Sequence, residues 1–201
     1  MVRRQLYASV YTIIRPRFYS SLCTIGRRTH TTTKMSNQNR LHIIIVGSGL
    51  AGLTAARILR EHHEVTVYER GNESVATGGQ GINIAPNAVK ILESIGYDRE
   101  RAGAVPIYGF RIYDKEGIVQ QDFDMPLKKK FGADMLTQKR SDFRDELMRL
   151  ATAPSASLGI KGNPAEMVFN SAVVGLDPEE GVIRLSDGSM AGADVVIGEY
   201  E

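Results

Sequence analysis

Leu41-His-Ile-Ile-Ile-Val-Gly-Ser-Gly-Leu-Ala-Gly52 is the stretch that decides the fold of this chain of 201 residues. Its first half is apolar, as expected of a buried strand, and it runs directly into three closely spaced glycines. The spacing Gly-x-Gly-x-x-Gly between a strand and a helix is the pattern that holds the diphosphate of a dinucleotide. A second strand, Val65–Glu69, follows and ends in a carboxylate. The sequence therefore predicts a dinucleotide-binding βαβ unit.

Each glycine in this stretch has its own physical reason. Gly47 lets the chain turn sharply off the strand, and Gly49 lacks the Cβ that would block the approach of a pyrophosphate. Gly52 allows the following helix, expected over Leu50–Leu59, to pack closely on the sheet. The first N–H groups of that helix face the phosphate charge, and Glu69 accepts hydrogen bonds from the adenosine ribose hydroxyls. The competing interpretation is an ordinary strand–turn–helix without a ligand.

Length and composition fit one medium-sized domain, or one domain with a tail. Hydrophobic residues make up 42% of the chain and charged residues 24%, which is ordinary for a globular protein. No apolar run reaches the roughly 18–20 residues that a membrane-spanning helix needs, so we expect no integral membrane segment. Cys23 is the one cysteine of the sequence, which excludes a disulfide framework and a thiolate metal cluster.

Residues 1–40 differ in charge from the rest of the chain. They contain eight Lys or Arg, ten Ser or Thr and no acid, whereas the other 161 residues carry a net charge of −6. Such a start is typical of a mitochondrial transit peptide, and we expect this tail to be disordered. A start of translation at Met35 would instead predict a cytoplasmic protein. We expect no nucleic-acid partner, because the tail lacks a folded basic face with interleaved aromatic residues.

The rest of the chain alternates helical and extended patterns after a loop, Gly71–Gly79, that is rich in Gly, Asn, Ser and Thr. Helices are predicted over Asn87–Ile95 and from the N-cap candidates Ser141 and Asp142 onward. Strands are predicted over Ile107–Tyr113, Gly117–Phe123, Ala133–Gln138, Val168–Leu176, Val182–Ser186 and Ala193–Gly198. The first two strands are expected to pair as an antiparallel insertion, and Asp187-Gly188 is expected to turn a hairpin. The last strand has the composition of a buried parallel strand.

Four stretches, in chain order, resemble the FAD-dependent aromatic hydroxylases, and among them the salicylate-hydroxylase-like monooxygenases. They are Ile45–Leu53, Val67–Arg70, Gly79–Ala88 and Lys139–Phe143. The final strand, Ala193–Gly198, is a fifth, so that the resemblance extends from about residue 41 to about residue 198. The resemblance implies an α/β fold: a Rossmann-like FAD-binding domain with a parallel sheet and an inserted antiparallel β element.

The resemblance also implies which residues hold the cofactor. The glycine loop cradles the FAD pyrophosphate, Glu69 binds the adenosine ribose, Arg140 reaches the cofactor from the start of its helix, and the segment near Gly79 passes the flavin end. The implied set of cofactor-binding residues is Gly47, Gly49, Gly52, Glu69, Arg70, Gly79, Gly81 and Arg140. The flavin would carry out the chemistry with NADH or NADPH as reductant, while protein side chains position and shield it.

The resemblance stops at the C-terminal end of the chain. Glu199-Tyr-Glu201 stands where such enzymes continue with Ala-Asp-Gly, a substrate domain and a Gly-Asp-Ala motif. We therefore expect residues 41–201 to form an FAD-binding domain without its substrate domain. Hydroxylation by this fragment is expected to be impaired, because the wall that excludes water from the flavin is missing.

The function that the resemblance implies is hydroxylation of a small aromatic compound with NAD(P)H and O2. The alternatives are a non-catalytic FAD-binding remnant and an NAD-dependent Rossmann dehydrogenase. Gly79–Ala88 and Arg140 favour FAD over NAD as the bound dinucleotide. No metal site is expected, because His62-His63-Glu64 has no further ligand at suitable spacing. The sequence assigns no catalytic side chain, no particular substrate and no oligomeric state.

Overall fold

The computed structural model describes residues 9–14, 40–73 and 80–200. Its main sheet has the strand order β1-β13-β2-β3-β9. These strands are β1 (Ser9–Ile14), β13 (Val195–Tyr200), β2 (His42–Val46), β3 (Glu64–Tyr68) and β9 (Glu166–Val168). The last four are parallel to one another, whereas β1 pairs antiparallel with β13 at the edge. The predicted parallel sheet and Rossmann-like fold class are confirmed.

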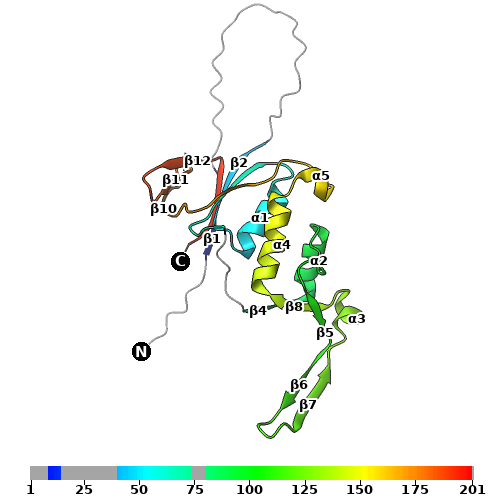
Figure 1. Ribbon diagram of the computed structural model, residues 1–201. Coiled ribbons are helices and arrows are strands. Elements are labelled where there is room, and N and C mark those ends of the chain that lie inside the picture. The colour runs from blue at the N-terminus through cyan, green and yellow to red at the C-terminus, as the bar shows by residue number, and fades with distance from the viewer. Residues whose placement is uncertain (1–8, 15–39, 74–79, 201) are drawn as a thin grey trace, which may run out of the picture.

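The βαβ unit lies at the centre of this sheet (Figure 1). Helix α1 spans Leu50–Leu59, as predicted from the glycine spacing, and connects β2 to β3. The middle three residues of both strands are buried, because helices and a small sheet cover the two faces. The carboxyl ends of β2 and β3 therefore lie beside each other, where ligands bind in sheets of this kind.

The predicted antiparallel insertion is also confirmed, except that its first strand begins at Gly109 and Ile107 belongs to a different sheet. β4 (Gly81–Ile84), β8 (Met135–Lys139) and β5 (Val105–Ile107) form a second sheet in the order β4-β8-β5. β6 (Gly109–Tyr113) and β7 (Val119–Asp124) form a hairpin that extends away from the rest of the molecule (Figure 1). β10 (Val173–Asp177), β11 (Val182–Leu185) and β12 (Met190–Gly192) form a third antiparallel sheet that includes the predicted Asp187-Gly188 turn.

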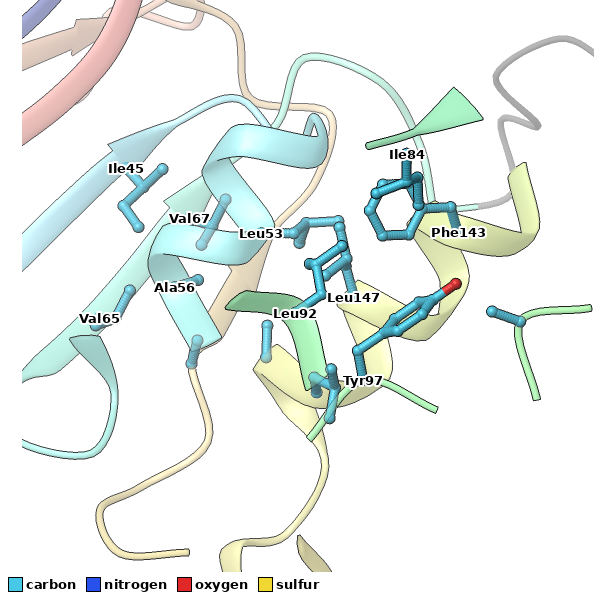
Figure 2. Packing of buried hydrophobic residues seen from close by; sticks show 14 of the residues in the cluster. Ile45, Leu53, Ala56, Val65, Val67, Ile84, Leu92, Tyr97, Phe143 and Leu147 are labelled. Atoms are coloured by element: carbon cyan, nitrogen blue, oxygen red, sulfur yellow. The ribbon is translucent and has the colours of Figure 1, made fainter. Parts of the chain in front are cut away.

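Two further helices build the core against α1. They are α2 (Pro86–Ser94) and α4 (Arg140–Thr152), and the short helices α3 (Leu127–Phe131) and α5 (Ser155–Leu158) lie in connecting segments. Leu53 of α1 and Leu147 of α4 are fully buried between the helices (Figure 2). Burial of each such leucine contributes about 1.5–3 kcal/mol. This packing places the start of α4 beside the start of α1.

The start of α4 differs from the prediction. The helix begins at Arg140 and has Lys139 as its N-cap, so that the N-cap assignment to Ser141 or Asp142 is wrong. The reason is a contact from outside the helix: the Arg140 N–H donates to the carbonyl oxygen of Gln80 at 2.9 Å. The Ser141 hydroxyl instead donates to the carboxylate of Asp142.

The predicted strand Val168–Leu176 is wrong as a single element. The chain leaves β9 after Val168 and enters β10 at Val173, so that the two halves belong to different sheets. Asn170 takes a positive φ of 55° at the break. The bend is stabilised because the N–H of Ser171 donates to the carbonyl oxygen of Glu69.

Strand β1 lies inside the predicted basic tail, an element that the sequence did not indicate. Its six residues pair in register with β13, from Ser9 opposite Tyr200 to Ile14 opposite Val195. The rest of the tail lies outside the described residues, so that its predicted targeting role stays a prediction. Among the residues that the structure describes, no helix has the length and apolar character needed to cross a membrane.

Candidate dinucleotide-binding site

The glycine loop turns off β2 with a geometry that only glycine tolerates easily. Gly47 has a φ of +96°, a left-handed conformation that L side chains rarely adopt. Its N–H donates to the carbonyl oxygen of Tyr68 at 2.8 Å, which joins the loop to the end of β3. The turn and the second strand are therefore held together at the site.

Gly52 allows α1 to lie directly against this loop. A Cβ at position 52 would be 2.2 Å from the carbonyl oxygen of Gly47 and 3.3 Å from the Ile45 side chain. The role predicted for this glycine was close packing of the helix on the sheet. In the structure the closest approach is to the backbone of the loop.

Gly49 presents the opposite situation, since no atom of the described residues lies within 4 Å of a Cβ built there. It is the N-cap of α1, without a side-chain hydrogen bond, and its φ of −71° is ordinary for any residue. Among the described residues, the protein's own packing therefore does not require a glycine at this position. The first N–H groups of a helix lack intrahelical acceptors, so that this end of α1 suits an anion such as a diphosphate.

The carboxylate of Glu69 is held against the glycine loop. Its Oε2 accepts hydrogen bonds from the Ser48 N–H and the Ser48 hydroxyl, both at 2.7 Å, and its Oε1 accepts one from the Gly71 N–H at 2.8 Å. A carboxylate has about four acceptor positions, so that these three bonds leave room for a further donor. Glu69 is half-buried, and it can thus meet a ribose hydroxyl at the loop.

The same contacts keep Glu69 ionised. Burial by itself raises the pKa of this carboxyl. The hydrogen bonds from Gly71 and Ser48, together with the positive charge of Arg144, lower it by more than burial raises it. The net result is a pKa below the ordinary value. At neutral pH the group is therefore an acceptor only, as binding of a diol requires.

Arg144 is a site residue that the sequence analysis did not identify. It lies in the second turn of α4, is 8% exposed, and donates to both oxygens of Ser48. The available signal was its spacing, because Arg144 follows Arg140 by four residues and so lies on the same face of the helix. Which residue that face contacts was not readable from the sequence.

The remaining predicted site residues are distributed as follows. Arg140 is half-buried at the start of α4, and its N–H is bonded to Gln80, the residue before β4. Gly81 begins β4 opposite Lys139, and a Cβ there would meet only an ordinary contact at 3.9 Å. Arg70 is exposed. Gly79 lies outside the described residues.

A metal centre finds no support in the described ranges. Residues 9–14, 40–73 and 80–200 contain no group of three His, Cys, Asp or Glu residues that is arranged to hold an ion. His63 instead accepts a hydrogen bond from the Leu41 N–H through its Nδ1. This histidine therefore has a structural contact at the foot of β2.

The fold and the glycine loop define a Rossmann-like dinucleotide-binding domain. Consistent with this class, residues 45–86 match the family model described as an NAD(P)-binding Rossmann-like domain. That match covers the glycine loop, α1, β3 and β4, the part of the chain from which the fold was predicted.

Comparison with known proteins extends the match beyond this unit. The chain is 33% identical over 174 residues to the 3-amino-4-hydroxybenzoate 2-monooxygenase PtmB3 of Streptomyces platensis, covering 83% of this chain and 40% of the relative. It is 32% identical over 168 residues to the FAD-dependent monooxygenase cfoG of Aspergillus candidus, covering 82% and 38%. The resemblance to FAD-dependent aromatic hydroxylases is thereby confirmed. The chain spans about two fifths of the length of these relatives.

A solved structure supports the fold. The HpxO protein of Klebsiella pneumoniae, in a variant complexed with FAD, aligns with a TM-score of 0.62 at 21% identity, covering 78% of this chain and 39% of that protein. At this level of identity the comparison establishes the Rossmann-like fold alone.

Proposed function

We propose that this domain binds FAD and is the cofactor-binding part of a monooxygenase that acts on a small aromatic compound. The observation that carries the proposal is the cradle at Gly47 and Gly49, where a Cβ would meet no atom of the described residues and the backbone is open to a ligand. The carboxylate of Glu69 is fixed beside that cradle by Ser48. The relatives, one of which is named as FAD-dependent, support FAD as the dinucleotide.

Within this proposal the residues divide by the part of the cofactor that they meet. The backbone of Gly47 and Gly49 and the first N–H groups of α1 would hold the diphosphate. Glu69 would accept hydrogen bonds from the adenosine ribose, as it has acceptor capacity left. The roles of Arg70, Arg140 and the Gly79–Gly81 segment toward the cofactor rest on the family resemblance.

Bound FAD would supply the redox chemistry, being reduced by NAD(P)H and activating O2 for insertion into an electron-rich ring. The protein's part is to hold the cofactor in place and to exclude water from the reacting end. A substrate of the hydroxybenzoate kind is proposed by analogy with the name of the Streptomyces relative.

The direct test is titration of the purified full chain, freed of cofactor, with FAD, FMN and NADH, followed by flavin fluorescence and calorimetry. The proposal expects binding of about one equivalent of FAD and weaker binding of FMN, which lacks the adenosine half. Binding of NADH with no binding of FAD would reject the flavin assignment and favour the dehydrogenase alternative.

The matched variant for this test is Gly49→Val. Because a Cβ at position 49 meets no atom of the described residues and the backbone conformation is ordinary, the variant should lose FAD affinity, while its stability falls by only about 1 kcal/mol from the less favoured N-cap residue. Ala156→Val adds two methyl groups, one carbon fewer than Gly49→Val, at an exposed position of α5 away from the loop, and it should leave both properties unchanged. Equal FAD affinity of Gly49→Val and wild type would contradict the proposed cradle.

A further inference from the structure

Arg144 and the glycine loop form a buried contact between distant parts of the chain. The guanidinium Nη2 donates to the Ser48 hydroxyl at 2.8 Å, and Nε donates to the Ser48 carbonyl oxygen at 3.2 Å. Ser48 is 1% exposed and Arg144 is 8% exposed, so both groups are shielded from water. The contact thus fixes Ser48 from the α4 side.

The direction of these hydrogen bonds determines where the serine proton points. An arginine side chain can only donate, whereas a hydroxyl has one proton and can accept as well. Because Arg144 donates to the hydroxyl oxygen of Ser48, the proton of that hydroxyl remains available for a different acceptor. It goes to Oε2 of Glu69, at 2.7 Å. The three residues therefore form a chain of donors that ends on the carboxylate.

The opposite charges of Arg144 and Glu69 also support a coupling between these two residues. A buried guanidinium is costly unless an anion compensates it. In the described part of the chain both hydrogen bonds of the Arg144 side chain go to Ser48. Glu69 lies on the other side of Ser48, and the positive charge of Arg144 lowers the pKa of its carboxyl. Arg144 and Glu69 are thus coupled through Ser48 rather than by direct contact.

We propose that Arg144 is a positioning residue for the ribose-binding carboxylate of Glu69 and acts through Ser48. The inference rests on the proposed function, since it concerns the same dinucleotide site. Its specific content is that Arg144 governs recognition of the ribose hydroxyls. A general role in stabilising the loop would affect every ligand of the site equally.

The test compares ADP with 2′,3′-dideoxy-ADP by calorimetry on the full chain. The ratio of the two dissociation constants measures the contribution of the ribose hydroxyls and cancels contributions from the diphosphate and the adenine. We expect wild type to prefer ADP, and Arg144→Met to reduce that preference about tenfold, the size of a lost hydrogen bond to a charged group. Arg144→Lys keeps the charge and one donor nitrogen and should retain part of the preference.

Two further variants separate positioning from folding. Arg149→Met, on the same helix but bonded to Glu146, is the control and should keep the wild-type preference. Ser48→Ala removes the intermediate hydroxyl with a minimal change in volume, so that it tests the relay even if Arg144→Met unfolds. Because Arg144 acts through Ser48, the double variant should lose little more than Ser48→Ala alone.

The pH dependence gives a readout that a purely structural role would not move. The preference for ADP should decline on acidification as Glu69 is protonated, and the midpoint should lie at higher pH in Arg144→Met than in wild type. An unchanged ADP preference in Arg144→Met would overturn the inference, as would a uniform loss of affinity for both nucleotides. Absence of any ADP preference in wild type would instead refute the ribose role of Glu69, whereas the proposed function fails only if the chain does not bind FAD.

Discussion

The α-carbon of Gly52 faces the carbonyl oxygen of Gly47 so closely that a Cβ would lie 2.2 Å from that oxygen. The contact is between α1 and the loop that precedes it, and both partners are backbone. Neither a rotamer change nor a flexible side chain can therefore relieve a larger residue at position 52. The third glycine of the motif is thus required by the protein's own packing, independently of any ligand.

Gly52→Ala is accordingly expected to destabilise the domain by about 1–3 kcal/mol or more, the range for overpacking at a rigid contact. The measurement is urea unfolding followed by circular dichroism. Gly49→Ala is the matched control, because its added methyl group meets no atom of the described part of the chain. The interpretation fails if the two alanine variants unfold at the same urea concentration.

Glu69 should make folding stability depend on pH in the acidic range. Its pKa in the folded chain lies below the ordinary value of 4.5, so that folding favours the ionised form. The resulting stabilisation is present at neutral pH and is lost as the pH falls through the ordinary value and then through the folded pKa. Glu69→Gln should therefore be less stable than wild type at pH 7, and the difference should narrow near pH 3.

Urea midpoints of wild type and Glu69→Gln at a series of pH values check this expectation. Glu179→Gln, at an exposed position, is the control and should track wild type throughout. A constant difference between Glu69→Gln and wild type from pH 7 to pH 3 would show that the hydrogen bonds to the carboxylate do not favour its ionised form.

The glycine loop could be predicted from sequence because each of its requirements is local. The turn at Gly47, the bare backbone at Gly49 and the close approach at Gly52 all act within six residues. The length of α1 followed from the same stretch, and the structure agrees with it to the residue. Short-range constraints of this kind appear directly as residue spacing.

The role of Arg144 could not be predicted because it depends on packing between distant segments. Its partner Ser48 is 96 residues away, and the contact arises from the way α4 lies beside α1. The start of α4 was misassigned for the same reason, since the backbone acceptor that bonds the N–H of Arg140 belongs to Gln80, before β4. At both positions a tertiary contact replaced the local rule.

Tyr97 should make stability fall in alkaline solution. Tyr97 lies in the core (Figure 2), its hydroxyl donates to Oε1 of Gln138, and burial raises the pKa of the phenol to about 12. The unfolded chain ionises this group at its ordinary value of 10.0, so that stability is retained below that pH and lost as the pH rises toward 12. Tyr97→Phe should remove this dependence and cost about 1–3 kcal/mol at neutral pH, because Gln138 keeps an acceptor without its donor.

Ultraviolet difference spectra follow the ionisation of tyrosines, and urea midpoints at pH 8 and pH 11 follow the stability. The control is Tyr108→Phe, because Tyr108 is 69% exposed. This variant should show the same alkaline loss of stability as wild type. If every tyrosine of the wild-type protein ionises near pH 10 while the protein stays folded, the buried hydrogen bond is contradicted.

Arg60 should be a larger determinant of stability than any exposed arginine. Its side chain is fully buried at the end of α1 and donates to the carbonyl oxygens of Leu150, Ala153 and Asn163 and to the hydroxyl of Ser155. Leu150 and Ala153 lie at the C-terminal end of α4, where carbonyls lack partners within the helix. Arg60→Met fills much of the volume but leaves these acceptors without a donor. Each unsatisfied acceptor costs about 1–3 kcal/mol, so that a total loss of stability of about 3 kcal/mol or more is expected.

The comparison for Arg60→Met is Arg111→Met, whose guanidinium pairs with Asp122 on the exposed β6–β7 hairpin. An exposed pair of this kind contributes little to stability, because solvent and salt screen it. Urea unfolding of both variants beside wild type measures the two losses on one scale. Because Arg60 joins the end of α1 to the end of α4, its loss should also loosen the packing that brings Arg144 to the glycine loop. FAD affinity should therefore fall in Arg60→Met even where most of the protein remains folded. If Arg60→Met is as stable as Arg111→Met, Arg60 does not stabilise the contact between α1 and α4.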